Sequence, residues 1–179
     1  NITRAKFIGQ SYGGFVAIDF AIKNQAMVEK LCIANCPGTT FNVAELETVC
    51  KSFGVSRVDE LFVFDDPLEL QRLLNLSTYS DKKLPKSVLK QAYAEYFSQN
   101  HVQLRQLMQS LPGEQARLTD VRPLQRIPTL VLWGEKDEIF SYAEGEKFAK
   151  TIQAQFISIP NSGHAVQVDQ HKAFTNVLG

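Results

Sequence analysis

Residues 6–21 read KFIGQSYGGFVAIDFA, a β-prone apolar run that passes through a glycine-rich turn into an apolar helical pattern. A serine on a strand-to-helix turn is pushed out above the edge of the sheet, because small neighbours let strand and helix approach each other. The helix N-terminus then points unpaired backbone N–H groups at the space above Ser11. The stretch predicts that Ser11 is a nucleophile and that the Tyr12 amide stabilises an oxyanion. The glycines predicted to shape this turn are Gly9, Gly13 and Gly14.

Four short apolar runs punctuate the chain and are separated by helical patterns. Continuous apolar runs without alternation are typical of parallel strands covered on both faces. Strands alternating with helices indicate βαβ crossovers and an α/β fold with a doubly wound sheet. The predicted strands are Ala5–Ile8, Leu31–Ala34, Thr129–Trp133 and Phe156–Ile159.

The middle of the chain carries helical stripes and no convincing strand. We therefore predict a helical insertion over residues 38–126, between core segments 1–37 and 127–179. Asp65 or Asp66 with Pro67 is a plausible helix start, while Phe53-Gly54 and Leu111-Pro112-Gly113 are typical of helix ends. The apolar side chains of these helical stripes could simply pack into a core. The alternative interpretation is that the helices form a cap over a pocket at the edge of the sheet.

His164 is the predicted general base among the three histidines. It lies in the loop Pro160–Ala165 directly after the last predicted strand, at the same edge of the sheet as Ser11. His101 lies within the helical insertion as a solvated or capping residue, and His171 lies on the exposed face of a terminal helix. A serine hydroxyl needs such a base, because it is a weak nucleophile until its proton is removed.

The predicted acid is Asp137, in the loop after the strand Thr129–Trp133. Its carboxylate would hold the His164 tautomer and stabilise the imidazolium. Glu135 and Glu138, in the same loop, are interpreted as solvated. The chain order Ser, Asp, His is the one expected for a nucleophile elbow on an α/β fold.

Three blocks make the chain resemble the α/β-hydrolase superfamily, in its capped lipase, esterase and C–C hydrolase group: residues 9–14, 127–137 and 159–164. The resemblance implies a Ser11–His164–Asp137 triad, an oxyanion donor at Tyr12 and no metal or organic cofactor. It also implies, more weakly, that some neighbours of the triad face the substrate pocket. Those neighbours are Cys36, Ile139 and Ala165.

The sequence departs from this family at its start. The family's sheet is longer, and the four predicted strands match its last four, so we expect a partial doubly wound sheet from a fragment that lacks the N-terminal half. The strand Ala5–Ile8 would then be an exposed apolar edge, and the second oxyanion donor would be absent.

The expected function is hydrolysis of a small hydrophobic carboxylic ester through an acyl-enzyme. A C–C bond hydrolase with the same triad and a non-catalytic small-ligand-binding protein remain alternatives. Apolar insertion residues suggest the hydrophobic moiety: Phe62, Phe64, Tyr93, Phe97 and Met108. Lys plus Arg and Asp plus Glu both total 19, so nothing indicates nucleic acid as a partner. No apolar run reaches the ~20 residues of a membrane span, and three cysteines without a disulfide or zinc pattern favour a reducing cytoplasm.

Overall fold

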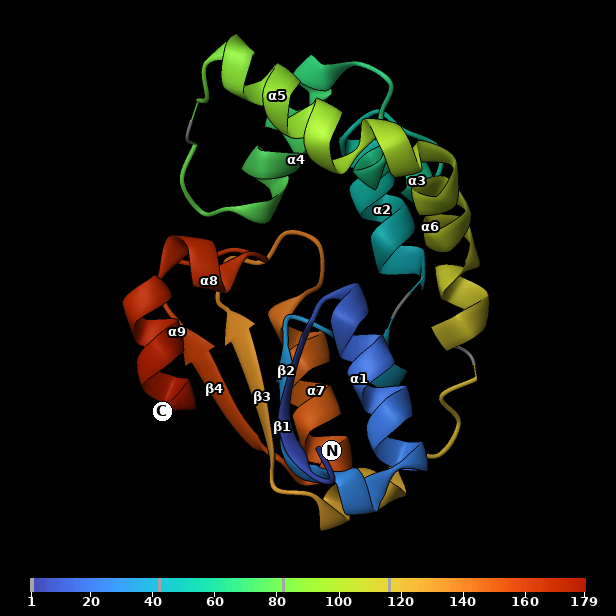
Figure 1. Cartoon of the computed structure of the whole chain (residues 1–179), viewed down its shortest axis with the longest axis vertical. Helices are drawn as coiled ribbons and strands as arrows, with labels where there is room; N and C mark the ends of the chain where they lie inside the picture. The colour runs from blue at the N-terminus through green and yellow to red at the C-terminus, as the bar shows by residue number, and fades with distance from the viewer. Residues whose placement is uncertain (1, 42, 82, 116) are drawn as a thin grey trace.

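The computed structural model describes residues 2–41, 43–81, 83–115 and 117–179. Its described residues form one parallel four-stranded sheet, in the order β1-β2-β3-β4 along both the sequence and the sheet (Figure 1). The four predicted strands are confirmed, and each is longer than predicted at one end. They are β1 (Ala5–Gln10), β2 (Val28–Ala34), β3 (Thr129–Gly134) and β4 (Gln155–Ile159).

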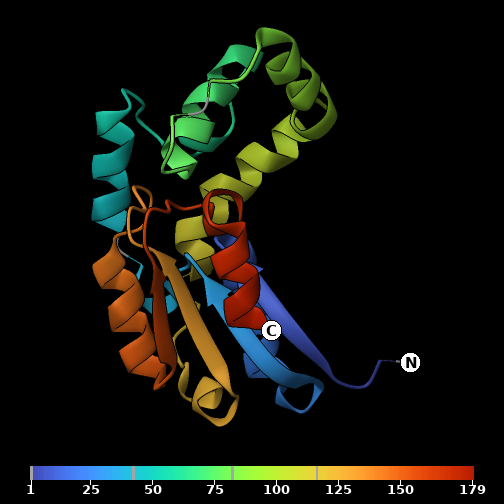
Figure 2. The same ribbon diagram turned by 90° about the vertical axis from the view of Figure 1, so that its left-hand side faces the viewer.

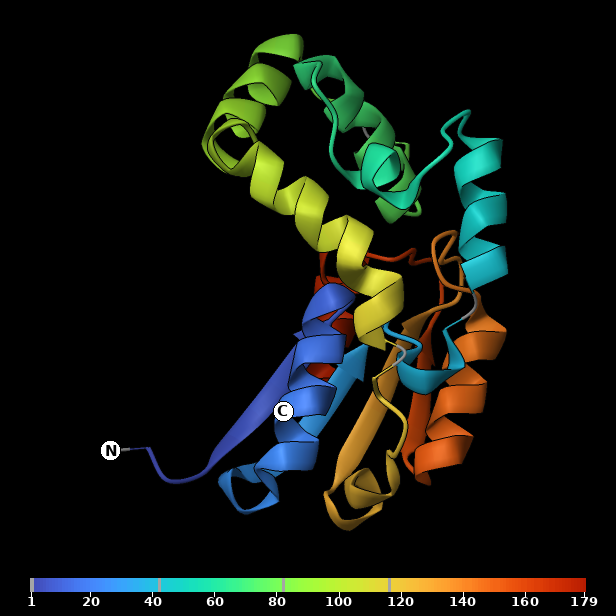
Figure 3. The same cartoon turned by 90° about the vertical axis from the view of Figure 1, so that its right-hand side faces the viewer.

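Helices cover the sheet on both faces. On one face lie α1 (Tyr12–Lys23) and α7 (Tyr142–Ile152), and on the other lies α9 (His171–Leu178), as Figures 2 and 3 show. The short helix α8 (Val166–Asp169) follows β4 at the C-terminal edge of the sheet. The expected α/β sandwich of helices around a parallel sheet is therefore present.

The central strands bury alternate side chains on the two faces. Ile33 and Val131 belong to the larger apolar core with α1 and α7, whereas Cys32 and Leu132 belong to a smaller core with α9. Successive side chains of a strand point to opposite faces, so a wholly apolar strand suits a sheet covered on both sides. The strand β1 lies at the edge of the sheet and leaves Ile8 56% exposed, which confirms the expected exposed apolar edge and shows that this strand is not covered on both faces.

The middle of the chain is helical, as predicted. Its α-helices are α2 (Val43–Ser52), α3 (Val58–Phe62), α4 (Leu70–Ser77), α5 (Lys86–Tyr96) and α6 (His101–Gln115). Short 3₁₀ turns join the elements of the chain: η1 (Gln25–Met27), η2 (Gly38–Thr40), η3 (Pro67–Glu69), η4 (Ser98–Asn100) and η5 (Arg122–Arg126). The cap helices, α2 to α6, lie beyond the C-terminal edge of the sheet, and α6 runs back toward α1 (Figures 1 and 3). The limits 38–126 for the cap stay a prediction, since η5 packs beside α1 and α7.

Part of the cap has an apolar core of its own. Phe64, Leu70 and Leu89 are buried together, and the rings of Tyr93 and Phe97 lie against them, with the Phe64 and Phe97 centroids 5.3 Å apart. The expectation that Phe64 provides a hydrophobic substrate surface is corrected here, because its ring is buried in this core. For the partly buried Tyr93 and Phe97 it stays a prediction.

The predicted helix end at Leu111-Pro112-Gly113 is wrong, because α6 continues through Pro112 to Gln115. An internal proline removes one helical hydrogen bond and crowds the preceding turn. Leu111 is buried in the main core, so tertiary packing holds the turn that the local pattern disfavours. The other predicted end is confirmed: α2 stops at Ser52, and Gly54 has a positive φ of 70°. At the predicted helix start, Asp66 accepts a hydrogen bond from the Leu68 amide at the N-terminus of η3.

Candidate active site

Ser11 lies on a strained turn between β1 and α1. Its φ of 52° and ψ of −124° are rare for a residue with a side chain, and such strain is a feature of functional sites. Two hydrogen bonds hold the turn: the Ser11 amide donates to the Ala34 carbonyl over 3.0 Å, and the Gly14 amide donates to the Ser11 carbonyl over 2.9 Å. The serine is thus fixed at the C-terminal edge of the sheet, at the start of α1.

The three glycines of the turn have different surroundings. A Cβ on Gly9 would lie 2.5 Å from the Gly13 carbonyl oxygen, and one on Gly14 would lie 2.5 Å from the Cys36 Cβ. A Cβ on Gly13 would meet no described atom within 4 Å. Close approach of β1 and α1 therefore requires glycine at 9, and the packing of α1 against Cys36 requires glycine at 14. The expectation that Gly13 allows strand and helix to approach is corrected.

Asp137 lies in the loop after β3, and its side chain is fully buried. Its Oδ1 accepts hydrogen bonds from the amides of Ile139, over 2.8 Å, and Phe140, over 3.1 Å. Its Oδ2 lies 2.8 Å from the Asn35 Nδ2 donor and 2.9 Å from His164 Nδ1. Burying a carboxylate is unfavourable unless it is hydrogen-bonded, and these four contacts, two of them from its own loop, offset that cost.

His164 lies in the loop after β4, with a side chain only 7% exposed. Its Nδ1 faces Asp137, which leaves Nε2 as the nitrogen for exchanging a proton with a reacting group. The Phe140 ring packs edge-on against the imidazole, with centroids 5.6 Å apart. The structure therefore brings Asp137 and His164 together as the sequence predicted.

The histidine loop crosses the sheet edge from β4 toward β1. The Gln10 Nε2 donates to the His164 carbonyl over 2.9 Å, so the residue before Ser11 touches the backbone of the predicted base. Within the described residues, the Ser11 hydroxyl makes no hydrogen bond to His164. Such a bond often tightens only when substrate is bound.

Sequence reasoning missed Asn35 and Gln10. Asn35 directly follows β2, is completely buried and adopts a positive φ of 47°. Gln10 accepts a hydrogen bond from Gln167 on α8 in addition to the one that it donates. A polar residue at the C-terminal end of an apolar strand was the available signal for both.

The other predicted histidines and acids lie apart from this cluster. Glu135 and Glu138 are exposed, as interpreted from the sequence, and His171 is exposed at the start of α9. His101 opens α6, where its Nε2 lies 2.7 Å from an Asp65 carboxylate oxygen in the cap.

The three cysteines are free thiols buried in the protein. Burial raises the pKa of Cys32 to about 11 and that of Cys36 to about 12. Both thiols therefore stay protonated near neutral pH and are poor nucleophiles, so neither competes with Ser11.

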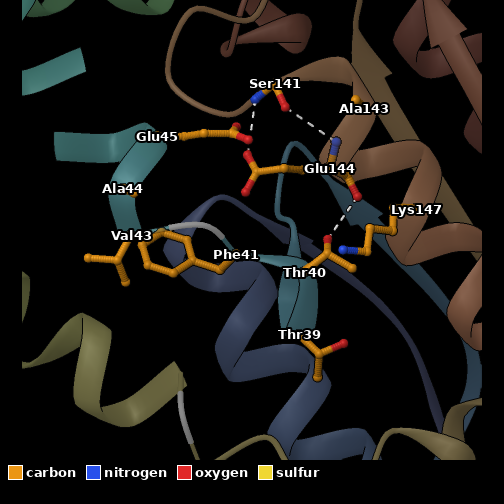
Figure 4. Close-up of a pocket in the computed structure, with 10 residues that line it drawn as sticks. All are labelled: Thr39, Thr40, Phe41, Val43, Ala44, Glu45, Ser141, Ala143, Glu144 and Lys147. Carbon is orange, nitrogen blue, oxygen red and sulfur yellow. Dashed lines mark hydrogen bonds between the residues drawn. The ribbon is translucent and has the colours of Figure 1, made fainter. Parts of the chain in front are cut away.

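The residues predicted to face a pocket are mostly covered. Cys36 and Ile139 are buried, with Cys36 against Gly14, while Ala165 is half-buried. Figure 4 shows a different cavity, of about 410 Å³, between the segment after β2 and the start of α7. Thr40 bridges its walls by donating to the Glu144 carbonyl over 2.8 Å. None of Ser11, Asp137 and His164 lines this cavity. The residues that line it are Thr39, Thr40, Phe41, Val43, Ala44, Glu45, Ser141, Ala143, Glu144 and Lys147.

Comparison with known proteins places the chain in a family. A family model described as "alpha/beta hydrolase fold" matches residues 1–170. The chain belongs to the α/β-hydrolase fold family. The human monoacylglycerol lipase ABHD6 is 26% identical over 180 residues, which cover 96% of this chain and 52% of that protein. A 2-hydroxy-6-oxononadienedioate/2-hydroxy-6-oxononatrienedioate hydrolase of Cupriavidus pinatubonensis is 26% identical over 182 residues, covering 99% of this chain and 62% of that protein.

Solved structures share the α/β-hydrolase fold. A mutant of the meta-cleavage product hydrolase CumD superimposes with a TM-score of 0.77 and 18% identity, over 99% of this chain and 64% of that one. The α/β-hydrolase chain described here spans about half the length of several curated relatives that it matches. Its described part contains no helix long and apolar enough to cross a membrane. Nor do the described residues place three or more His, Cys, Asp or Glu side chains where they could hold a metal ion.

Proposed function

We propose that this α/β-hydrolase chain carries the catalytic triad of a serine hydrolase that cleaves carboxylic esters. The observation that carries the proposal is the 2.9 Å contact between His164 Nδ1 and Asp137 Oδ2, in a loop whose backbone touches the residue before Ser11. The strained backbone of Ser11 supports its assignment as the nucleophile.

The proposed reaction has two halves. His164 Nε2 removes the Ser11 hydroxyl proton as the oxygen attacks the ester carbonyl, and the Tyr12 amide stabilises the tetrahedral oxyanion. His164 then gives that proton to the leaving alcohol as the C–O bond breaks. Water, deprotonated by His164, attacks the acyl-enzyme and releases the acid and Ser11. Asp137 holds the proton on Nδ1 and stabilises the imidazolium.

A small hydrophobic ester is the proposed substrate. The relative ABHD6 is named a monoacylglycerol lipase, which supports this choice of substrate. The choice of Ser11 as nucleophile is separate and is supported by the burial of Cys32 and Cys36, whose thiols stay protonated. The hydrolase from Cupriavidus pinatubonensis supports a second candidate, cleavage of a C–C bond beside a carbonyl by the same triad. A non-catalytic ligand-binding role is the third.

Labelling with a fluorophosphonate, followed by peptide mass spectrometry, tests the triad in the full-length protein. We expect an adduct on Ser11, with Ser11→Ala as the blank, and a labelling rate reduced at least ~10³-fold in His164→Ala, because the residues of a triad act as a unit. If the protein is folded and gives no adduct, the serine-hydrolase proposal is overturned and the ligand-binding role takes its place.

Substrate assays separate the two hydrolase candidates. A series of p-nitrophenyl esters of rising acyl length tests ester cleavage, and a vinylogous 1,5-diketone tests C–C cleavage. Ester turnover that is lost in Ser11→Ala supports the esterase. A kcat/KM at least ~10²-fold higher for the diketone than for every ester would favour the C–C hydrolase, because specificity is a ratio of kcat/KM values.

A further inference from the structure

One carboxylate joins the cap to the loop that carries His164. Asp169, at the end of α8, accepts two backbone hydrogen bonds on its Oδ2: from the Gly163 amide over 2.9 Å and from the Tyr79 amide over 2.8 Å. Gly163 directly precedes His164, and Tyr79 follows α4 of the cap by two residues. One oxygen atom therefore connects two segments that are far apart in the sequence.

Direct contacts strengthen the same junction. The Ala165 amide, on the other side of His164, donates to the Ser77 carbonyl at the end of α4 over 2.7 Å. A Cβ on Gly163 would lie 3.1 Å from the Ser77 oxygen and equally close to backbone atoms of Thr78 and Tyr79. The cap backbone therefore lies directly against the histidine loop.

The backbone around His164 is held from three directions. Asp169 binds the amide before it, the cap carbonyl of Ser77 binds the amide after it, and Gln10 binds its own carbonyl. Hydrogen bonds to a charged acceptor are the stronger kind. A shift of about 1 Å at a reacting group can cost about 10² in rate, so the position of this backbone matters for a general base.

We propose that Asp169 is a positioning residue that couples the seating of the cap, through Tyr79, to the placement of His164. This inference rests on the proposed function, because it takes His164 as the base. The end of α4 cannot move away without breaking its hydrogen bonds to Asp169 and Ala165. Displacement of the cap therefore loosens the histidine loop, and seating of the cap orders it.

Substitutions of Asp169 in the full-length protein test the link. Asp169→Ala removes the acceptor, so we expect the Gly163 and Tyr79 amides to exchange hydrogen at least about tenfold faster. We also expect kcat for a p-nitrophenyl ester to fall at least about tenfold, while KM stays within about twofold of the wild-type value. Asp169→Asn keeps an acceptor oxygen and should retain most of the activity. Asp120→Ala, which removes a surface carboxylate paired with Arg122, should behave as the wild type.

Substitutions of Tyr79 test the cap arm alone. Tyr79→Pro removes the amide donor, and the residue before it, Thr78, already has the φ of −118° and ψ of 147° that precede proline. Tyr79→Ala keeps the amide and alters only a side chain that is 51% exposed. We expect kcat to fall about fivefold or more in Tyr79→Pro and to be unchanged in Tyr79→Ala, which keeps the test valid if Asp169→Ala does not fold.

The outcomes separate this inference from the proposed function. A kcat within about twofold of wild type in Asp169→Ala or in Tyr79→Pro, while Ser11→Ala is inactive, would overturn the coupling and leave the triad standing. If the wild type neither turns over an ester nor labels at Ser11, the proposed function fails. In that case, faster exchange of both amides in Asp169→Ala still supports the link between cap and loop, and unchanged exchange overturns it.

Discussion

Gly13 and Gly14 are adjacent residues of α1 whose substitution should have opposite effects. In Gly14→Ala the new Cβ would lie 2.5 Å from the Cys36 Cβ and 2.7 Å from its sulfur, so we expect a loss of about 1–3 kcal/mol in the free energy of unfolding. Gly13→Ala meets open space among the described atoms and should gain about 0.5–1 kcal/mol, because alanine favours the helix. Urea unfolding of both variants measures the two free energies of unfolding. Equal changes in the two variants would contradict this prediction.

At the same residue scale, local pattern predicted Ser11, Asp137 and His164, because each lies in the turn or loop that follows an apolar strand at one edge of a parallel sheet. It could not separate Gly13 from Gly14, since the contact that distinguishes them comes from Cys36, after another strand. Asn35 was missed for a similar reason: its amide reaches Asp137 across 102 residues of sequence. Such contacts depend on how loops cross above the sheet, which periodicity does not encode.

At the scale of elements, Asp59 joins α3 to α6 within the cap. Its buried carboxylate accepts from the Arg57 guanidinium over two 2.9 Å bonds and from Arg105 of α6 over 3.2 Å. The hydrogen bonds from Arg57, together with the one from Arg105, lower the pKa of Asp59 from 3.8 to about 2. A lowered pKa gives stability that is present above the unfolded value and is lost as pH falls through the folded value.

The expected result is a stability difference between wild type and Asp59→Asn that depends on pH. Wild type should be more stable by about 1–3 kcal/mol near pH 6, and the difference should shrink between about pH 4 and about 2. Asp120→Asn is the control, because its pKa is also lowered to about 2, by Arg122, but its side chain is 48% exposed and surface pairs contribute little. Denaturant unfolding at several pH values tests this, and a difference that does not vary with pH would refute the assignment.

Elements were more predictable than their ends and partners. The apolar runs predicted all four strands, since buried parallel strands need no polar face. The passage of α6 through Pro112 was not predictable, because the burial of Leu111 that supports it is a tertiary contact. The pairing of Arg105 with Asp59, 46 residues away, likewise has no local signature.

At the scale of the whole molecule, the edge strand β1 is expected to promote self-association of this chain when it is isolated. An exposed apolar edge strand promotes pairing between chains, and Ile8 on β1 is 56% exposed. We therefore expect Ile8→Lys to reduce self-association, because a charged side chain on the edge disfavours a second strand. Val16→Lys is a matched control: Val16 is also 56% exposed but lies on α1 and not on the edge strand. Light scattering and sedimentation at equal concentrations should show fewer large species for Ile8→Lys alone; an equal reduction in both variants would attribute the effect to net charge.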